Sequence, residues 1–178
     1  GFFDMPVDNL FTTPLFAKYI KKKFKTRKLI CVSPDIGGVQ RTRGLATKIK
    51  ADLAIIDKRR PRPGQSKVMN IIGDVRGKTC IIVDDIIDSG GTIVNAVDAL
   101  KKAGAVDVYA FITHAVLSGD AADKIKKSKI KKLIITDSID NSLKIKNNSK
   151  IEVISIAPLM AEAINRISNS TSVSDLFN

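Results

Sequence analysis

An acidic stretch beside a glycine-rich turn carries the clearest chemical signal in the sequence. Residues 79–92 read TCIIVDDIIDSGGT, in which an apolar run ends at two adjacent carboxylates and a third carboxylate opens Ser-Gly-Gly-Thr. Glycines remove the Cβ atoms that would keep backbone N–H groups away from an anion, and the start of a helix adds positive potential. We therefore predict a phosphate-binding loop made of Asp88, Ser89, Gly90, Gly91 and Thr92.

The adjacent carboxylates of Asp84 and Asp85 need a different partner, because a bound phosphate would repel them. Hydroxyl groups and divalent cations are partners that carboxylates accept beside a phosphate. A sugar phosphate supplies vicinal hydroxyls as well as the phosphate. The stretch thus predicts a phosphorylated sugar held together with a metal ion. The alternative is an ordinary acidic turn between a strand and a helix.

A second glycine motif, SPDIGGVQRTRGLA, spans residues 33–46 and again lies between an apolar run and a helical pattern. Gly37 and Gly38 allow close backbone approach, and Asp35 precedes them. An acidic residue beside a phosphate-binding loop can serve as a metal ligand, and we expect this role for Asp35. Arg41 and Arg43 lie on the helix that follows, where they are either surface or interface arginines or part of the site.

A third motif is the basic stretch DKRRPRPGQSK of residues 57–67. Its prolines and glycine predict a loop after a strand, and this loop carries Lys58 and Arg60. Basic groups near a sugar-phosphate site suit transfer of a phosphoryl-type group, because such catalysis consists mostly of positioning and neutralisation of developing charge. A plain basic surface loop is the alternative.

The elements that must position these motifs alternate along the chain. Strands are predicted over residues 29–33, 53–57, 69–73, 79–83, 106–113, 133–136 and 151–154, and helices over 12–24, 39–50, 92–103, 120–127 and 158–167. Apolar strands that alternate with helices indicate an α/β fold with a mostly parallel twisted sheet flanked by helices. Ligands bind such sheets at the carboxyl ends of the strands, and all three motifs are predicted to lie there.

Composition narrows the class of protein. The 178 residues suffice for one domain, with a leading segment over residues 1–12 and a tail over 170–178. The formal net charge is +12, but aromatic residues make up only 5% and tryptophan is absent, so we expect a solvated basic surface rather than a nucleic-acid partner. No apolar run is long enough for a membrane span. Cys31 and Cys80 lie in apolar runs and are predicted to be buried thiols, which fits a cytoplasmic location.

The acidic stretch resembles the signature of the type I phosphoribosyltransferases, and the whole chain resembles the C-terminal half of the ribose-phosphate pyrophosphokinase (PRPP synthetase) family. The segments that carry the wider resemblance are GFFDMPVDNL, SPDIGGVQR, IIDKRRPRPG, VMNIIGDVRGK, VDDIIDSGGT, THAVLSG, APLMAEAINRIS and SVSDLF. Ordinary phosphoribosyltransferases share the acidic motif but lack the KRRP loop and GFFDMPVDNL.

This resemblance implies transfer of the diphosphate of MgATP to the 1-hydroxyl of ribose 5-phosphate, which gives PRPP and AMP. It implies that Asp84 and Asp85 hold the ribose hydroxyls and that the loop of residues 88–92 holds the 5-phosphate. It further implies a diphosphate loop with Asp35, Gly37 and Gly38, in which Asp35 is a Mg2+ ligand. Lys58 and Arg60 would stabilise the transition state.

The family also implies a hexamer and an allosteric site for a phosphate or nucleotide. The residues that match this allosteric region are Asp8, Asn9, Ser172, Val173, Ser174 and Phe177. Local capping and interface packing are the alternative roles for them. The only histidine, His114, is more consistent with a structural role near the site than with catalysis.

The family's N-terminal domain, which carries most of the adenine pocket, has no counterpart in these residues. We therefore expect that the 178 residues alone do not make PRPP and that a missing domain or a complementary chain supplies the ATP site. Two other functions stay open: a non-catalytic relative associated with PRPP synthetase, and a stand-alone phosphoribosyltransferase. The intact KRRPRPG loop argues against the first, and the lack of a segment that would grip a base argues against the second.

Overall fold

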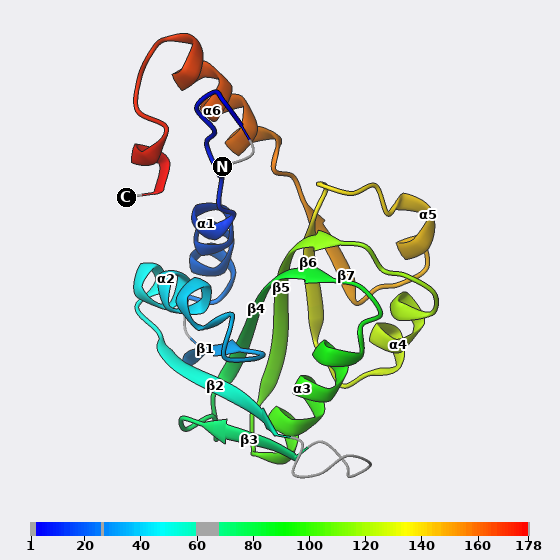
Figure 1. The fold of residues 1–178 in the computed structure, drawn as a ribbon. Helices are drawn as coiled ribbons and strands as arrows, with labels where there is room; N and C mark the ends of the chain where they lie inside the picture. Colours follow the sequence, from blue (N-terminus) through cyan, green and yellow to red (C-terminus); the bar gives the residue numbers. More distant parts are fainter. Residues whose placement is uncertain (1–2, 26, 60–67, 178) are drawn as a thin grey trace.

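A computed structural model describes residues 3–25, 27–59 and 68–177 of the chain. Within that part, the strands are β1 (Leu29–Ser33), β2 (Asp52–Arg59), β3 (Val68–Ile72), β4 (Thr79–Ile87), β5 (Asp107–Ala115), β6 (Lys132–Thr136) and β7 (Ile151–Ile154). They form one twisted sheet in the order β3-β2-β1-β4-β5-β6-β7 (Figure 1). All neighbouring pairs are parallel except β2 and β3, which confirms the predicted mostly parallel sheet.

Helices cover both faces of the sheet, and the last helix lies beyond its carboxyl edge. The helices are α1 (Thr13–Lys23), α2 (Val39–Ile49), α3 (Gly91–Lys102), α4 (Ala121–Lys127), α5 (Ser142–Ile145) and α6 (Ala157–Ser168), followed by a 3-10 turn, η1 (Ser174–Phe177). In Figure 1, α1 and α2 lie against one face of the sheet, and α3 and α4 lie against the other.

The central strand β4 shows why the sheet needs both layers. Alternate side chains of a strand point to opposite faces. Cys80 and Ile82 accordingly pack into the core under α3 and α4, whereas Ile81 and Val83 pack into the core under α1 and α2. The continuous apolar run of β4 is therefore buried on both sides, as expected for a strand inside a parallel sheet.

Several element bounds differ from the sequence-based ones. β4 does not end at Val83 but continues to Ile87, because β5 stays paired with it as far as Ala115. Lys58 lies in β2 rather than in a loop, because the antiparallel strand β3 pairs with it at Met69. The short helix α5 was not predicted. The remaining predicted strands and helices are confirmed, with bounds that shift by at most two residues.

The leading segment and the tail meet beside the sheet. Figure 1 shows α6 and the N-terminal segment on the same side of the molecule, beyond the carboxyl edge of the sheet. Phe11 of the leading segment contacts Phe177 of the tail edge-on, with ring centroids 5.5 Å apart. Most of α6 is exposed, and Ala163 is its one buried side chain. The leading segment and the tail thus form one surface region.

Both cysteines are free and buried, as predicted. Burial raises the pKa of the Cys31 and Cys80 thiols to about 12, since the charged thiolate is poorly solvated inside the protein. Across the described residues, the structure contains no helix of the length and apolar character that crossing a bilayer requires.

Phe111 provides a test of the layer formed by α1 and α2. Its fully buried ring contacts Phe16 and Tyr19 edge-on, with centroid distances of 5.4 and 5.7 Å. We expect Phe111→Ala to lower the free energy of unfolding by about 3–5 kcal/mol, because it removes these contacts and leaves a cavity. Urea denaturation measures this change. The same substitution at Phe3, which is 69% exposed, should change it by less than about 0.5 kcal/mol, and equal effects would contradict the assignment of the core.

Candidate functional site

The structure brings the two glycine motifs together at the carboxyl edge of the sheet. β1 and β4 are neighbours in parallel, so the loops that follow them emerge on the same edge. Asp35 from the first motif and Asp84 from the second line one cavity of about 240 Å3. The other residues that line this cavity are Ile86, Ile87, Asp88, Ser89, Gly90, Thr92 and Ile93. The predicted meeting of the two glycine motifs is therefore present in the fold, whereas most of the third motif lies outside the described residues.

The loop before α3 has the backbone that its glycines predicted. Gly90 has a φ of +76°, in the left-handed region that favours glycine, and it is the N-cap residue of α3. Its carbonyl accepts the first helical hydrogen bond from the N–H of Val94, at 3.0 Å. The free N–H groups at the start of a helix, together with its dipole, favour an anion. With the Ser89 and Thr92 hydroxyls at the cavity, the loop is suited to a phosphate.

The loop before α2 is tightly folded on itself. The Ser33 hydroxyl donates to the carbonyl of Asp35 at 2.6 Å, and the Gly38 N–H donates to Oδ1 of Asp35 at 3.0 Å. A Cβ atom at Gly38 would lie 2.9 Å from the Ser33 Oγ, which is closer than real Cβ contacts allow. Any side chain at this position would therefore force the Ser33 hydroxyl to shift from its bond to Asp35, and α2 begins directly after Gly38.

The acidic pair is held by Arg41, a residue whose role the sequence left open. Nη1 of Arg41 donates to Oδ1 of Asp84 at 2.8 Å, and its Nη2 donates to Oδ2 of Asp85 at 2.7 Å. The position of an arginine one turn after a glycine loop was the available signal, but Arg43 shares it nearly as well. Only the packing of α2 beside β4 distinguishes the two arginines.

Asp84 and Asp85 differ in their surroundings. The Asp84 side chain is 16% exposed and that of Asp85 is 56% exposed. Burial raises the pKa of Asp84 above its ordinary value, although the N–H of Asp85 and the guanidinium of Arg41 act in the opposite direction. Asp84 therefore lies at the wall of the protein interior, and Asp85 lies toward solvent.

A second cavity lies next to the acidic pair and opens on the leading segment. It has a volume of about 380 Å3, and its lining residues are Asn9, Leu10, Phe11, Thr12, Thr13, Arg41, Asp85, Ile86, Thr113 and His114. His114 lies in β5, and its Nδ1 is 3.0 Å from the Ser138 Oγ. The acidic pair is thus shared between two cavities, since Asp84 lines the first and Asp85 lines the second.

The other predicted site residues are placed less fully. Lys58 is partly exposed on β2, whereas Arg60 lies outside the described residues. Of the predicted allosteric residues, Asn9 lines the second cavity and Asp8 is exposed beside it in the chain. In the tail, the Ser172 carbonyl accepts a hydrogen bond from Arg166 at 2.8 Å, and the Ser172 and Ser174 hydroxyls are 2.9 Å apart. The Phe11–Phe177 contact connects the two parts of this predicted set.

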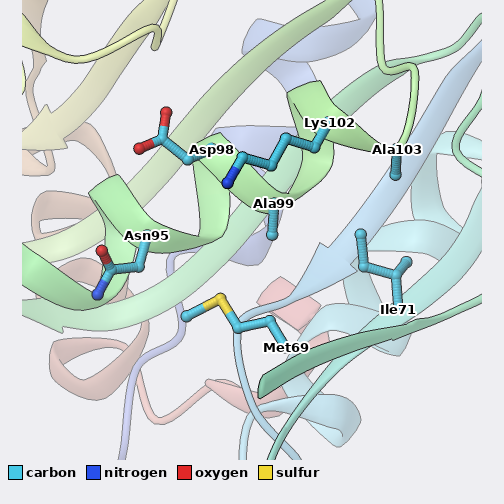
Figure 2. A pocket seen from close by; sticks show the side chains of 7 residues that line it. All are labelled: Met69, Ile71, Asn95, Asp98, Ala99, Lys102 and Ala103. Carbon is cyan, nitrogen blue, oxygen red and sulfur yellow. The ribbon is translucent and has the colours of Figure 1, made fainter. Parts of the chain in front are cut away.

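A larger hollow, of about 960 Å3, lies between β3 and α3, apart from the cavity where the two glycine motifs meet (Figure 2). It is lined by Met69, Ile71, Asn95, Asp98, Ala99, Lys102 and Ala103. None of the predicted binding residues that the structure describes is among them. Its polar residues come from one side of α3, and its floor is the apolar side of β3.

The carboxylates fit a magnesium ion in one particular mode. In the described part of the chain, no group of three or more His, Cys, Asp and Glu side chains is arranged to hold a metal. Mg2+ is usually held by one or two protein carboxylates, with waters and substrate phosphates as its other ligands. Asp35 and Asp84 line the same cavity and offer this oxygen chemistry.

Comparisons with known proteins agree with this geometry. Residues 56–178 match the model of the phosphoribosyl synthetase-associated domain. The chain belongs to this family. It is 57% identical, over its whole length, to a ribose-phosphate pyrophosphokinase of Bradyrhizobium diazoefficiens, of which it covers 56%. It is 53% identical to that of Agrobacterium fabrum, again over its whole length and 57% of the relative.

A solved structure supports the same resemblance. The phosphoribosylpyrophosphate synthetase of Mycobacterium smegmatis matches 95% of the chain with a TM-score of 0.86 and 36% identity, and 54% of that structure is covered. The chain therefore spans about half the length of the ribose-phosphate pyrophosphokinases that it matches. The predicted resemblance to this family and the predicted fold class are confirmed.

The backbone of the phosphate loop can be tested with two glycines. We expect Gly90→Ala to lower the free energy of unfolding by about 1–2 kcal/mol, because alanine is strained at a φ of +76°. Gly44→Ala is the matched control, since Gly44 lies inside α2 and a Cβ there meets nothing within 4 Å. That substitution should raise stability by about 0.5–1 kcal/mol. Chemical denaturation measures both changes in the free energy of unfolding. Changes of the same sign in the two variants would contradict the assigned loop geometry.

Proposed function

We propose that the chain is the ribose-phosphate-binding part of a ribose-phosphate diphosphokinase. The reaction transfers the diphosphate of MgATP to the 1-hydroxyl of ribose 5-phosphate and gives PRPP and AMP. The single observation that carries this proposal is the meeting of Asp35, Asp84 and the Ser89–Thr92 loop around one cavity. The printed names of the similar proteins support the choice of reaction.

The roles follow from the chemistry of each group. The loop of residues 88–92 binds the 5-phosphate through its backbone N–H groups and hydroxyls. Asp84 and Asp85 accept hydrogen bonds from the ribose hydroxyls. The Gly38 N–H donates to Asp35, so the other backbone N–H groups of that loop bind the diphosphate, and Gly37 and Gly38 allow its close approach. Together these contacts fix the sugar by its two ends, so that its 1-hydroxyl faces the diphosphate loop.

Asp35 is the proposed ligand of Mg2+. Its carboxylate lies beside the diphosphate loop and shares a cavity with Asp84. When bound, the ion would neutralise charge on the diphosphate oxygens. Asp35 thereby orients both the loop, through its bond from the Gly38 N–H, and the cation. This shared task explains an acidic residue at a site for anions.

Lys58 and Arg60 are proposed to stabilise the transition state during diphosphate transfer. Phosphoryl transfer depends on positioning and on neutralising the charge that develops on the equatorial oxygens. Lys58 lies near the end of β2, the strand that pairs with β1 and therefore ends at the same edge as the diphosphate loop. Lys58 is thus at the edge of the sheet where the proposed diphosphate loop lies.

The wider assembly is also part of the proposal. We place these residues as the C-terminal domain of a protein whose remaining half, in the same chain or in another, supplies the ATP site. A homo-oligomer, such as the hexamer that the resemblance implies, is supported by the apolar side chains that α6 exposes at Met160, Ile164 and Ile167. The shared surface of the leading segment and the tail is the proposed allosteric region. Buried free thiols are compatible with a cytoplasmic location.

A second candidate function is a regulatory partner without catalysis, and the description of the matching family as synthetase-associated favours it. Such a partner would have no use for the acidic pair or the diphosphate loop, so ribose 5-phosphate binding separates the two functions. A chain that lacks this binding altogether would favour the regulatory role.

Ribose 5-phosphate binding should depend on the acidic pair. We expect the double substitution Asp84→Asn with Asp85→Asn to abolish measurable binding of ribose 5-phosphate in isothermal calorimetry, because amides hold hydroxyls less strongly than carboxylates do. Circular dichroism should show an intact fold. Asp123→Asn on the exposed face of α4 is the control. Unchanged affinity in the double variant would refute the assigned site.

Lys58 should affect turnover more than binding. In the enzyme assembled with its ATP-binding half, we expect Lys58→Ala to lower kcat by about 100-fold or more, with little change in ribose 5-phosphate affinity. The exposed Lys126→Ala is the control for loss of one positive charge. AMP formation measures the rate. A defect in affinity alone would contradict the transition-state role.

A further inference from the structure

Arg41 has no part in the roles assigned so far, although it makes the most specific contact of the site. Its guanidinium bridges two different carboxylates at 2.8 and 2.7 Å. These are the same carboxylates that are proposed to hold the ribose hydroxyls. Every ligand of the acidic pair must therefore either displace Arg41 or share the carboxylates with it.

The bridge is chemically specific to arginine. The two terminal nitrogens of one planar guanidinium reach the two acids at the same time, whereas a lysine ammonium is a single point charge. Asp84 and Asp85 are consecutive, and Asp85 further donates its N–H to Oδ1 of Asp84 at 3.0 Å. Without a cation between them, two neighbouring carboxylates of which one is largely buried repel each other. Arg41 supplies positive charge between the two carboxylates.

Arg41 also lies beside the proposed diphosphate loop. It is the third residue of α2, whose N-cap is Gly38. A Cβ atom built on Gly38 would be 3.7 Å from Nη1 of Arg41, so the guanidinium lies next to the loop backbone. The Arg41 side chain is 33% exposed, and it lines the cavity on the Asp85 side. Rotation of the Arg41 side chain could therefore move the guanidinium from the carboxylates to the loop proposed to bind the diphosphate.

We infer that Arg41 is a positioning residue that exchanges partners during binding: it neutralises Asp84 and Asp85 in the empty site and moves to the diphosphate when ligands bind. This inference rests on the proposed function of the site. A divalent cation and ribose hydroxyls replace the guanidinium at the carboxylates, and the diphosphate, which carries more negative charge than either carboxylate, receives it. The acidic pair then becomes available to the sugar in step with the arrival of the diphosphate.

Removal of Arg41 distinguishes the exchange from a static salt bridge, because the two predict different changes in cation affinity and diphosphate affinity. If Arg41 competes with cations for the carboxylates, its removal strengthens cation binding there. If the same side chain binds phosphate, its removal weakens diphosphate binding. If the guanidinium only braces β4 against α2, its removal would loosen the whole site, and both ligands would bind more weakly. The two mechanisms therefore predict opposite results for the cation.

The experiment compares the 178-residue chain with its Arg41→Ala, Arg41→Lys and Arg43→Ala variants. Mn2+ binding is measured by electron paramagnetic resonance, and inorganic pyrophosphate binding is measured by calorimetry in metal-free buffer with a chelator. We expect Arg41→Ala to bind Mn2+ about tenfold more tightly and pyrophosphate about tenfold more weakly. Arg41→Lys should strengthen Mn2+ binding but keep part of the pyrophosphate affinity. Arg43→Ala, an exposed change on the same helix, should alter neither.

Other outcomes overturn the inference. Weaker binding of both ligands by Arg41→Ala, with Arg41→Lys as the folded comparison, assigns Arg41 a bracing role only. Unchanged Mn2+ binding shows that the guanidinium does not compete for the acids. Ribose 5-phosphate binding by the wild-type chain tests the proposed function separately. If the wild-type chain binds ribose 5-phosphate and Arg41→Ala gives either of these two results, the proposed function stands and the exchange of partners is refuted. If ribose 5-phosphate and pyrophosphate both fail to bind the wild-type chain, the proposed function falls as well.

Discussion

The parallel pairing of β1 with β4 is the constraint on which the rest of the site depends. These strands lie side by side, with Val32 opposite Ile82, and each is followed by a glycine loop and a helix. Because both strands run in the same direction, both loops and both helix N-termini face the same edge of the sheet. Antiparallel pairing would place them at opposite edges. Strand direction therefore brings the two glycine loops to one place before any side chain is considered.

The same constraint creates an electrostatic problem that the fold solves locally. Bringing the loops together also brings Asp35, Asp84 and Asp85 to one edge, where carboxylates raise the free energy of one another's charged forms. The helix N-termini offset part of this charge, and Arg41 offsets more of it at the acidic pair. The formal net charge of +12 acts over longer distances and favours the approach of phosphorylated ligands, an effect that salt screens.

The acidic pair also divides the space at the sheet edge. Asp84 belongs to the cavity shared with Asp35 and the phosphate loop, and Asp85 belongs to the cavity bounded by Asn9 and His114. A ligand held by both carboxylates would therefore extend from the Asp35 cavity to the leading segment. That segment meets the tail at the Phe11–Phe177 contact. Phe11 and Asp85 line the same cavity, so the surface where the leading segment meets the tail lies next to the acidic pair.

The sequence by itself determined the fold class, most elements and the two glycine loops, because these depend on local information. Apolar runs, glycines and helix starts act over a few residues, so β1, α3 and the turn at Gly90 follow from their own segments. The acidic stretch also predicted a phosphorylated sugar and a metal ion as ligands, since carboxylates beside a phosphate-binding loop accept few partners, and this stays a prediction. The resemblance added the proposed reaction and the proposed residue roles.

Only the tertiary structure decided which distant groups meet. The extension of β4 to Ile87 depends on pairing with β5, and the place of Lys58 in β2 depends on β3, so neither could be deduced from local propensity. Arg41 contacts Asp84 and Asp85, which lie 43 and 44 positions further along the chain, and this contact requires α2 to pack beside β4. Packing brings together side chains that are so far apart in sequence, and no short stretch of sequence predicts such a contact.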